Sequence, residues 1–131
     1  MSKFPSAYYA DMVANKYFAN VDRKNMDAVL DTFTPGAVFT IQSAFTTHVG
    51  RDTGIRQMFA NLFENYTKIV HKDFVHVADL ERNAVASQFN VELVDPAGKL
   101  TTLSNCNFFY LDEAGKFQRV FVYMSGPNVL V

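Results

Sequence analysis

The chain has 131 residues, of which 49% are hydrophobic and 13 are phenylalanines. This length and apolar content are typical of a single domain that buries its own core. The net charge of -1 and the pI of about 6.3 indicate no basic surface, so no nucleic-acid partner is expected. Cys106 is the single cysteine, which excludes an internal disulfide and a cysteine-rich metal site.

The N-terminal stretch Met1–Tyr9 has one lysine, one proline and no apolar core, so it is not typical of a secretion signal. No apolar run approaches the ~20 residues that span a bilayer. We therefore expect a cytoplasmic protein with no membrane partner.

The spacing of apolar residues predicts three helices and one strand in the first half of the chain. The helices are expected over residues 6 to about 20, 24–32 and 52 to about 66, with Ser6 and then Asp52 or Thr53 as caps. Pro35-Gly36 is expected to end the second helix, and the strand over residues 37–41 follows it.

The second half consists of four strand-like segments, at residues 67–79, 84–94, 99–111 and 116–124. The short turns between them predict an antiparallel meander. Helices first and strands afterwards indicate the α+β class. Because no repeat, low-complexity tract or linker divides the chain, residues 1–131 are interpreted as one domain.

Alternation along the strands assigns side chains to two faces. The segment 99–111 is partly apolar on both, since Leu103, Phe109 and Leu111 on one face alternate with Phe108 and Tyr110 on the other. A sheet with one face against helices and the other against a partner has this pattern. We therefore expect a homodimer formed through the sheet.

Five stretches of the chain, taken in order, resemble the nuclear-transport-factor-2-like superfamily, which includes SnoaL-like cyclases and ketosteroid isomerases. They are residues 15–22, 25–33, 37–39, 48–55 and, in the final hairpin, 111–117 with 122–125. The resemblance implies a cystatin-like, cone-shaped α+β barrel, in which three N-terminal helices pack on a curved antiparallel sheet around an apolar cavity. It also implies a homodimer.

The stretch 123–131 is similar to the C-terminal part of ketosteroid isomerases, which use a carboxylate base and an oxyanion hole of a tyrosine and a protonated aspartate. By this resemblance, Tyr17 takes the place of the tyrosine and Asn107 that of the aspartate. Ile41 takes the place of the base. Isoleucine cannot move a proton, so steroid isomerisation by the usual mechanism is not expected.

Three histidines are available to replace the missing base. His71 is the preferred candidate, because dehydratase-like members of the superfamily carry a pocket histidine on the strand after the third helix. It is expected to share a face with Ile69, Asp73, Val75 and Val77, where Asp73 would raise its pKa. His76 is expected on the opposite face of the strand and His48 in a loop. The alternative to a catalytic His71 is a solvated histidine at the mouth of the pocket.

One cavity beneath the helices is expected to be lined by Tyr17, Phe33, Phe59, His71, Phe89, Asn107 and Met124, with Asn105 as a further ligand-binding residue. In the alternative, the aromatic residues and asparagines are ordinary core. The histidines do not have metal-ligand spacing and no phosphate-binding loop is present, so no metal or cofactor is expected.

The favoured hypothesis is a SnoaL-like, cofactor-independent isomerase or lyase of the dehydratase or cyclase type. Its substrate would be a small apolar compound with a carbonyl or hydroxyl group. His71 would move the proton, and Tyr17 and Asn107 would hold the oxyanion. Two alternatives remain open: a pocket that binds an apolar ligand without chemistry, and a dimerisation module with a vestigial cavity.

Overall fold

The computed structural model describes residues 4–131. Residues 1–3, which belong to the stretch expected to carry no secretion signal, lie outside the described residues. The helical segments are α1 (Ser6–Asp11), η1 (Met12–Phe18), α2 (Ala19–Asp22), α3 (Met26–Leu30), η2 (Gln42–Ala44), η3 (Gly50–Ile55) and α4 (Arg56–Asn65). No helix within residues 4–131 is long and apolar enough to cross a membrane.

The three helices predicted for the first half of the chain are present. The segments α1, η1 and α2 follow one another without a break as the first helix, and η3 and α4 form the third. Tyr9, Val13, Tyr17 and Val21 recur at helical spacing along the first helix and are all buried. The second helix, α3, is capped by Asn25, whose side-chain oxygen accepts from the Ala28 amide at 3.2 Å.

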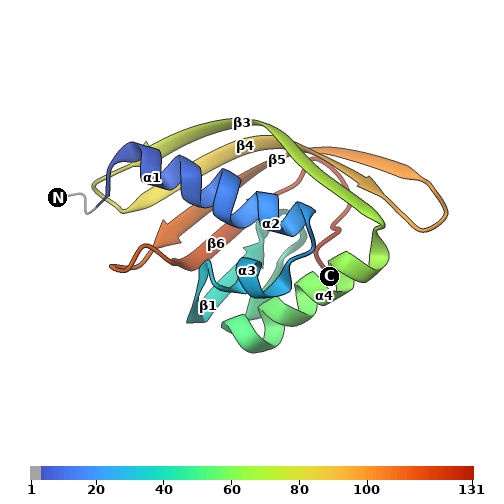
Figure 1. Cartoon of the computed structure of the whole chain (residues 1–131), viewed down its shortest axis with the longest axis horizontal. Helices are drawn as coiled ribbons and strands as arrows, with labels where there is room; N and C mark the ends of the chain where they lie inside the picture. The colour runs from blue at the N-terminus through green and yellow to red at the C-terminus, as the bar shows by residue number, and fades with distance from the viewer. Residues whose placement is uncertain (1–3) are drawn as a thin grey trace.

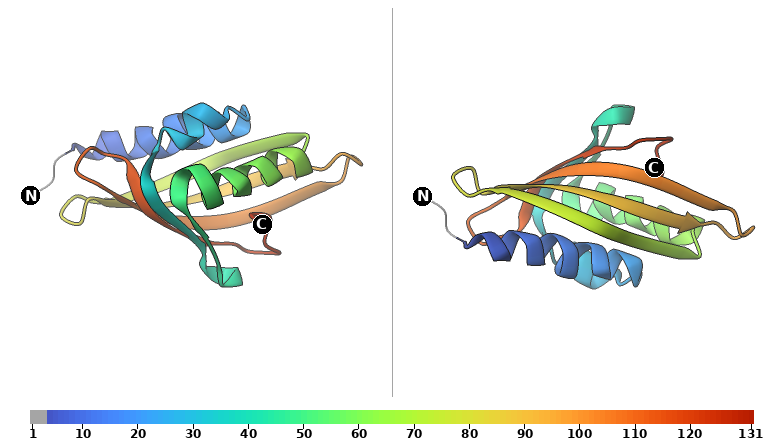
Figure 2. Two further views of the ribbon diagram at one scale, coloured as in Figure 1. Left: turned by 90° about the horizontal axis from the view of Figure 1, so that it is seen from below. Right: turned by 90° about the horizontal axis from the view of Figure 1, so that it is seen from above.

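The strands are β1 (Phe33–Ile41), β2 (Thr46–Val49), β3 (Lys68–Asp79), β4 (Ala84–Val94), β5 (Leu100–Leu111) and β6 (Phe117–Tyr123). They form one sheet in the order β2-β1-β6-β5-β4-β3. The predicted meander of β3 to β6 is antiparallel, whereas β1 pairs with β6 in parallel, so the sheet is mixed. The sheet arches over the helices on one side (Figures 1 and 2), and the predicted α+β class is confirmed.

Several local expectations for the first half were wrong. The expected caps Ser6, Asp52 and Thr53 lie inside helical segments whose N-caps are Pro5 and Val49. Residues 46–49, expected in a loop, pair with β1 as an edge strand. Pro35 and Gly36 do not end a helix but lie inside β1, where the pairing with β6 shifts register between Phe33 and Val38. An irregularity in the ladder tolerates a residue that lacks an N–H donor.

The alternation predicted for β5 is confirmed, and β4 alternates in the same way. Val85, Phe89 and Leu93 are buried on one strand, and Asn105 and Phe109 are buried on the other. Phe108, on the other face of β5, is 39% exposed.

The strand β3 departs from the predicted alternation because it contains a bulge. Asp73 and Phe74 together oppose the single residue Phe89, and Asp73 has a φ of 59°. The extra residue reverses the faces beyond it, so His76 pairs with the buried Ser87. The prediction that His71 and His76 lie on opposite faces was therefore wrong.

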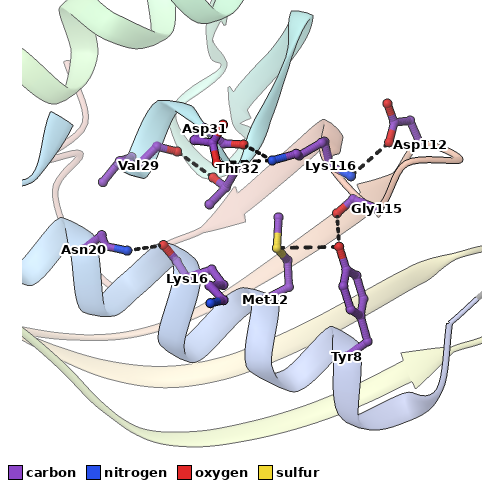
Figure 3. Close-up of polar contacts among 10 residues, drawn as sticks. All are labelled: Tyr8, Met12, Lys16, Asn20, Val29, Asp31, Thr32, Asp112, Gly115 and Lys116. Carbon is purple, nitrogen blue, oxygen red and sulfur yellow. Dashed lines mark hydrogen bonds and ion pairs between the residues drawn. The ribbon is translucent and has the colours of Figure 1, made fainter. Parts of the chain in front are cut away.

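The turn between β5 and β6 is tied to the helices (Figure 3). The Tyr8 hydroxyl donates to the carbonyl of Gly115 at 2.9 Å, and Lys116 Nζ donates to the carbonyl of Asp31 at 2.6 Å. Gly115 has a φ of 84°, and a Cβ at this position would lie 2.1 Å from the Tyr8 oxygen. The turn therefore requires glycine both for its backbone conformation and for the close approach of Tyr8.

Candidate functional site

A cavity of about 30 Å³ lies between the first helix, α4 and the inner face of the sheet. This volume exceeds the ~10–15 Å³ that one water molecule needs. Its wall is mostly apolar, with a few polar side chains, and consists of Tyr17, Phe18, Val21, Phe59, Leu62, His71, Phe89, Val91, Leu93, Asn105, Asn107, Val122, Met124, Val129 and Leu130. A mostly apolar wall with a few polar groups is typical of the lining of a small-molecule site.

The structure brings most of the predicted pocket residues together at this cavity. Tyr17, Phe59, His71, Phe89, Asn105, Asn107 and Met124 all belong to its wall. Phe33 does not: it is 1% exposed and packs edge-on against Tyr17 and Phe117, with ring centroids 5.8 and 5.6 Å away. Phe33 therefore packs against the ring of Tyr17 and is not part of the cavity wall.

His71 is held against the cavity by Asp22, the last residue of α2. Its Nδ1 lies 2.5 Å from one carboxylate oxygen of Asp22, and its backbone N–H donates to the other oxygen at 3.0 Å. The two side chains are 9% and 25% exposed. Because a carboxylate only accepts, Nδ1 carries the proton and the lone pair of the neutral ring is at Nε2.

The predicted partner of His71, Asp73, is elsewhere. Asp73 is exposed in the bulge and accepts a hydrogen bond from Asn90 at 3.0 Å. The actual partner, Asp22, was missed because it lies 49 positions away along the chain. One signal in the sequence was available: Asp22 follows Phe18 by one helical turn, which places it on the inner side of the helix.

Tyr17 projects from the first helix into a group of aromatic side chains. Its ring contacts Phe59, Phe109 and Phe117 edge-on, with centroid distances of 6.1, 5.6 and 5.6 Å. Burial raises the pKa of its phenol. The hydroxyl therefore stays protonated near neutral pH and remains a hydrogen-bond donor.

Asn107 contributes an amide from β5 to the same wall. It is 2% exposed, and its Oδ1 is buried without a hydrogen-bond partner among residues 4–131. An unpaired buried polar group is costly, by ~1–3 kcal/mol. Its neighbour on the same face, Asn105, instead accepts from the Ser125 amide at 3.3 Å. Asn107 is therefore the asparagine whose amide oxygen is available to accept a hydrogen bond from a bound molecule.

The other two histidines lie outside the cavity wall. His76 Nδ1 is 2.8 Å from the Ser87 hydroxyl, and burial lowers the pKa of this histidine. His48 is in β2, and its Nε2 is 3.0 Å from the Leu130 carbonyl. No group of three His, Cys, Asp or Glu side chains with metal-binding geometry occurs within the described part of the chain.

Comparison with known proteins assigns the chain to a family. Residues 14–120 match the model of the SnoaL-like domain. The chain therefore belongs to the SnoaL-like family, one of those that its sequence resembles. No curated protein matches the chain.

Several solved structures are similar over nearly the whole chain. A candidate aromatic ring hydroxylase from Novosphingobium aromaticivorans is 28% identical, with a TM-score of 0.74 and coverage of 95% of this chain and 94% of its own. A candidate SnoaL-like polyketide cyclase from Shewanella denitrificans is 13% identical, with a TM-score of 0.78 and coverage of 92% of both chains. A nuclear-transport-factor-2-like protein from Exiguobacterium is 16% identical, with a TM-score of 0.74 and coverage of 87% and 98%.

Proposed function

We propose that the cavity binds a small apolar compound with a carbonyl or hydroxyl group and that His71 transfers a proton to and from it. The reaction would be a cofactor-independent isomerisation or elimination, of the dehydratase or cyclase type. Membership of the SnoaL-like family and the similarity to a candidate polyketide cyclase agree with this class of chemistry.

The observation that carries the proposal is the pairing of His71 with Asp22 at the cavity wall. A carboxylate on Nδ1 selects the tautomer that leaves Nε2 as the base, and it stabilises the imidazolium formed when Nε2 takes a proton. This pair replaces the carboxylate base that Ile41 cannot supply. Ile41 is fully buried in β1 and is not part of the cavity wall.

The proton transfer uses only groups of this chain. His71 Nε2 takes the proton from the carbon next to a substrate carbonyl, and the electron pair of that C–H bond forms the enolate. The Tyr17 hydroxyl and the Asn107 amide are the nearby donors for the enolate oxygen. The imidazolium then returns its proton to another carbon, or to a hydroxyl that leaves as water.

The second candidate function is binding of an apolar ligand without chemistry. The mostly apolar wall of the cavity favours this function, since no base is needed to bind an apolar group. Ligand extraction followed by mass spectrometry would identify a molecule that co-purifies with the protein.

Exchange of α-protons in heavy water distinguishes the two functions without knowledge of the natural substrate. Cyclohexanone and 2-tetralone would be incubated with the protein, and loss of their α-proton signals would be followed by NMR. We expect exchange with the wild type and with His76→Gln, and loss of exchange with His71→Gln. A ketone that binds without exchange would support the ligand-binding function instead.

We also propose a homodimer through the outer face of the sheet. This face carries the pairs Phe108–Tyr123 and Tyr110–Phe121, with ring centroids 5.9 and 6.1 Å apart. Phe108 and Tyr123 are 39% and 44% exposed, which leaves an apolar surface for a partner. Light scattering that gives the mass of one chain at micromolar concentration would contradict the dimer.

A further inference from the structure

The segment 124–131 differs from the rest of the cavity wall in its secondary structure. Met124, Val129 and Leu130 line the cavity, yet the segment belongs to no helix or strand. Every other residue of the wall lies within the first helix, α4 or the strands β3 to β6. The rest of the wall is therefore held by continuous backbone hydrogen bonds, and this segment is not.

The far end of the segment is fastened by two side chains. His48 Nε2 on β2 bonds to the Leu130 carbonyl at 3.0 Å, and Asn61 Nδ2 on α4 donates to the Val131 carbonyl at 2.9 Å. In Figure 1 this end of the chain lies beside α4. Segments held by a few partly exposed hydrogen bonds are the ones that open locally at low cost.

The size of the cavity requires that some part of its wall moves if a ring compound is to bind. The free volume is about 30 Å³, whereas a cavity of ~150 Å³ is known to accept benzene. Val129 and Leu130 fill space next to His71 and Asn107, which are the groups that the proposed chemistry needs. Moving these two side chains enlarges the cavity without breaking the sheet.

We propose that the segment 124–131 is the removable wall of the cavity, and that His48 and Asn61 are positioning residues that keep it closed. A ring-sized ligand then enters where Val129 and Leu130 lie, and the segment sets the size of molecule that the cavity admits. This inference rests on the proposed function only in taking the cavity as the ligand site.

Stopped-flow binding of 1-naphthol tests the proposal, because this probe is a flat apolar ring with one hydroxyl group. The chain contains no tryptophan, so the probe fluorescence is read without protein background at long excitation wavelengths. The variant is His48→Ala with Asn61→Ala. The matched control is Asn15→Ala, which removes an exposed hydrogen bond of 2.7 Å to Asp11 on the first helix.

Hydrogen–deuterium exchange of residues 124–131 is measured on the same proteins. We expect exchange of the segment and association of 1-naphthol to accelerate together, by roughly two- to tenfold for each lost hydrogen bond. The control should match the wild type in both measurements. Thermal unfolding of each variant verifies that the domain is folded.

Three results would overturn the inference. Faster exchange with an unchanged association rate means that ligands enter elsewhere, and unchanged exchange means that His48 and Asn61 do not hold the segment. In both cases the proposed function stands. If 1-naphthol binds neither the wild type nor the variant, the cavity is not a ligand site, and the proposed function falls together with the removable wall.

Discussion

The strand β3 carries two histidines on its helix-facing side, and their surroundings differ. His71 lies before the bulge, pairs with the carboxylate of Asp22 and lines the cavity. His76 lies after the bulge, pairs with the hydroxyl of Ser87 and lies outside the cavity wall. The partner of His71 is thus a carboxylate, which fits the proton transfer proposed for it, whereas the partner of His76 is a neutral hydroxyl. The difference comes from the side chains that the fold places against each ring.

The largest expected effect distinguishes His71, the proposed base, from His76. His71→Gln should lower proton transfer to a ketone substrate by ~10²–10⁴-fold, the usual contribution of a general base. His76→Gln should leave the rate within the error of the wild type. The measurement is the rate of α-proton exchange at saturating ketone. Equal rates in the two variants would contradict the distinction between the two ends of the strand.

The second prediction compares the buried polar residues Ser87 and Asn107, which are paired across β4 and β5. Asn107→Leu should weaken binding of a carbonyl ligand by roughly 0.5–3 kcal/mol but cost little stability, because it removes an amide without a partner. Ser87→Ala should leave binding unchanged and cost about 1 kcal/mol of unfolding free energy, since His76 then loses its hydrogen bond. Calorimetric titration and urea unfolding measure the two quantities.

Tyr17→Phe should resemble Asn107→Leu in its effect on binding. The phenyl ring keeps the edge-on contacts with Phe59, Phe109 and Phe117 and loses only the hydroxyl. We expect a loss of roughly 0.5–3 kcal/mol in binding of a carbonyl ligand. A variant that binds as tightly as the wild type would show that the hydroxyl does not contact the ligand.

The third comparison concerns the bulge that places both histidines on one face. Asp73 has a φ of 59°, which a β-branched side chain adopts poorly and glycine adopts freely. Asp73→Val should therefore be less stable than Asp73→Gly by roughly 1–2 kcal/mol. Both variants lose the hydrogen bond to Asn90, so the difference isolates the backbone. Similar urea midpoints for the two would argue against a strained left-handed residue at this point.

The smallest expected effect is a pH dependence of stability from His76. Burial lowers its pKa in the folded protein below the ordinary value of 6.5. As the pH falls below about 6.5, the unfolded chain binds a proton before the folded chain does, so the free energy of unfolding decreases. His76→Gln should flatten this part of the pH profile, as measured by thermal unfolding. A profile identical to that of the wild type would mean that another group causes the loss.

Local pattern was sufficient for most of the elements and faces, although it missed the edge strand β2. The period of the apolar residues determined three helices and four later strands, and the alternation on β4 and β5 placed Phe89, Asn105 and Asn107 on the inner face. These features depend on residues close to one another in the chain. The choice of His71, Tyr17 and Asn107 came from resemblance to a family, and the cavity wall contains all three.

Tertiary structure decided everything that joins distant parts of the chain. The pairing of Asp22 with His71 and the parallel contact of β1 with β6 depend on how separate elements pack, which no local pattern encodes. The far end of the segment 124–131 is bonded by His48 and Asn61, which β2 and α4 bring to it from distant parts of the chain. The bulge is the sharpest case: one extra residue at Asp73 is invisible to a period of two, yet it reverses the face of every side chain that follows it in the strand.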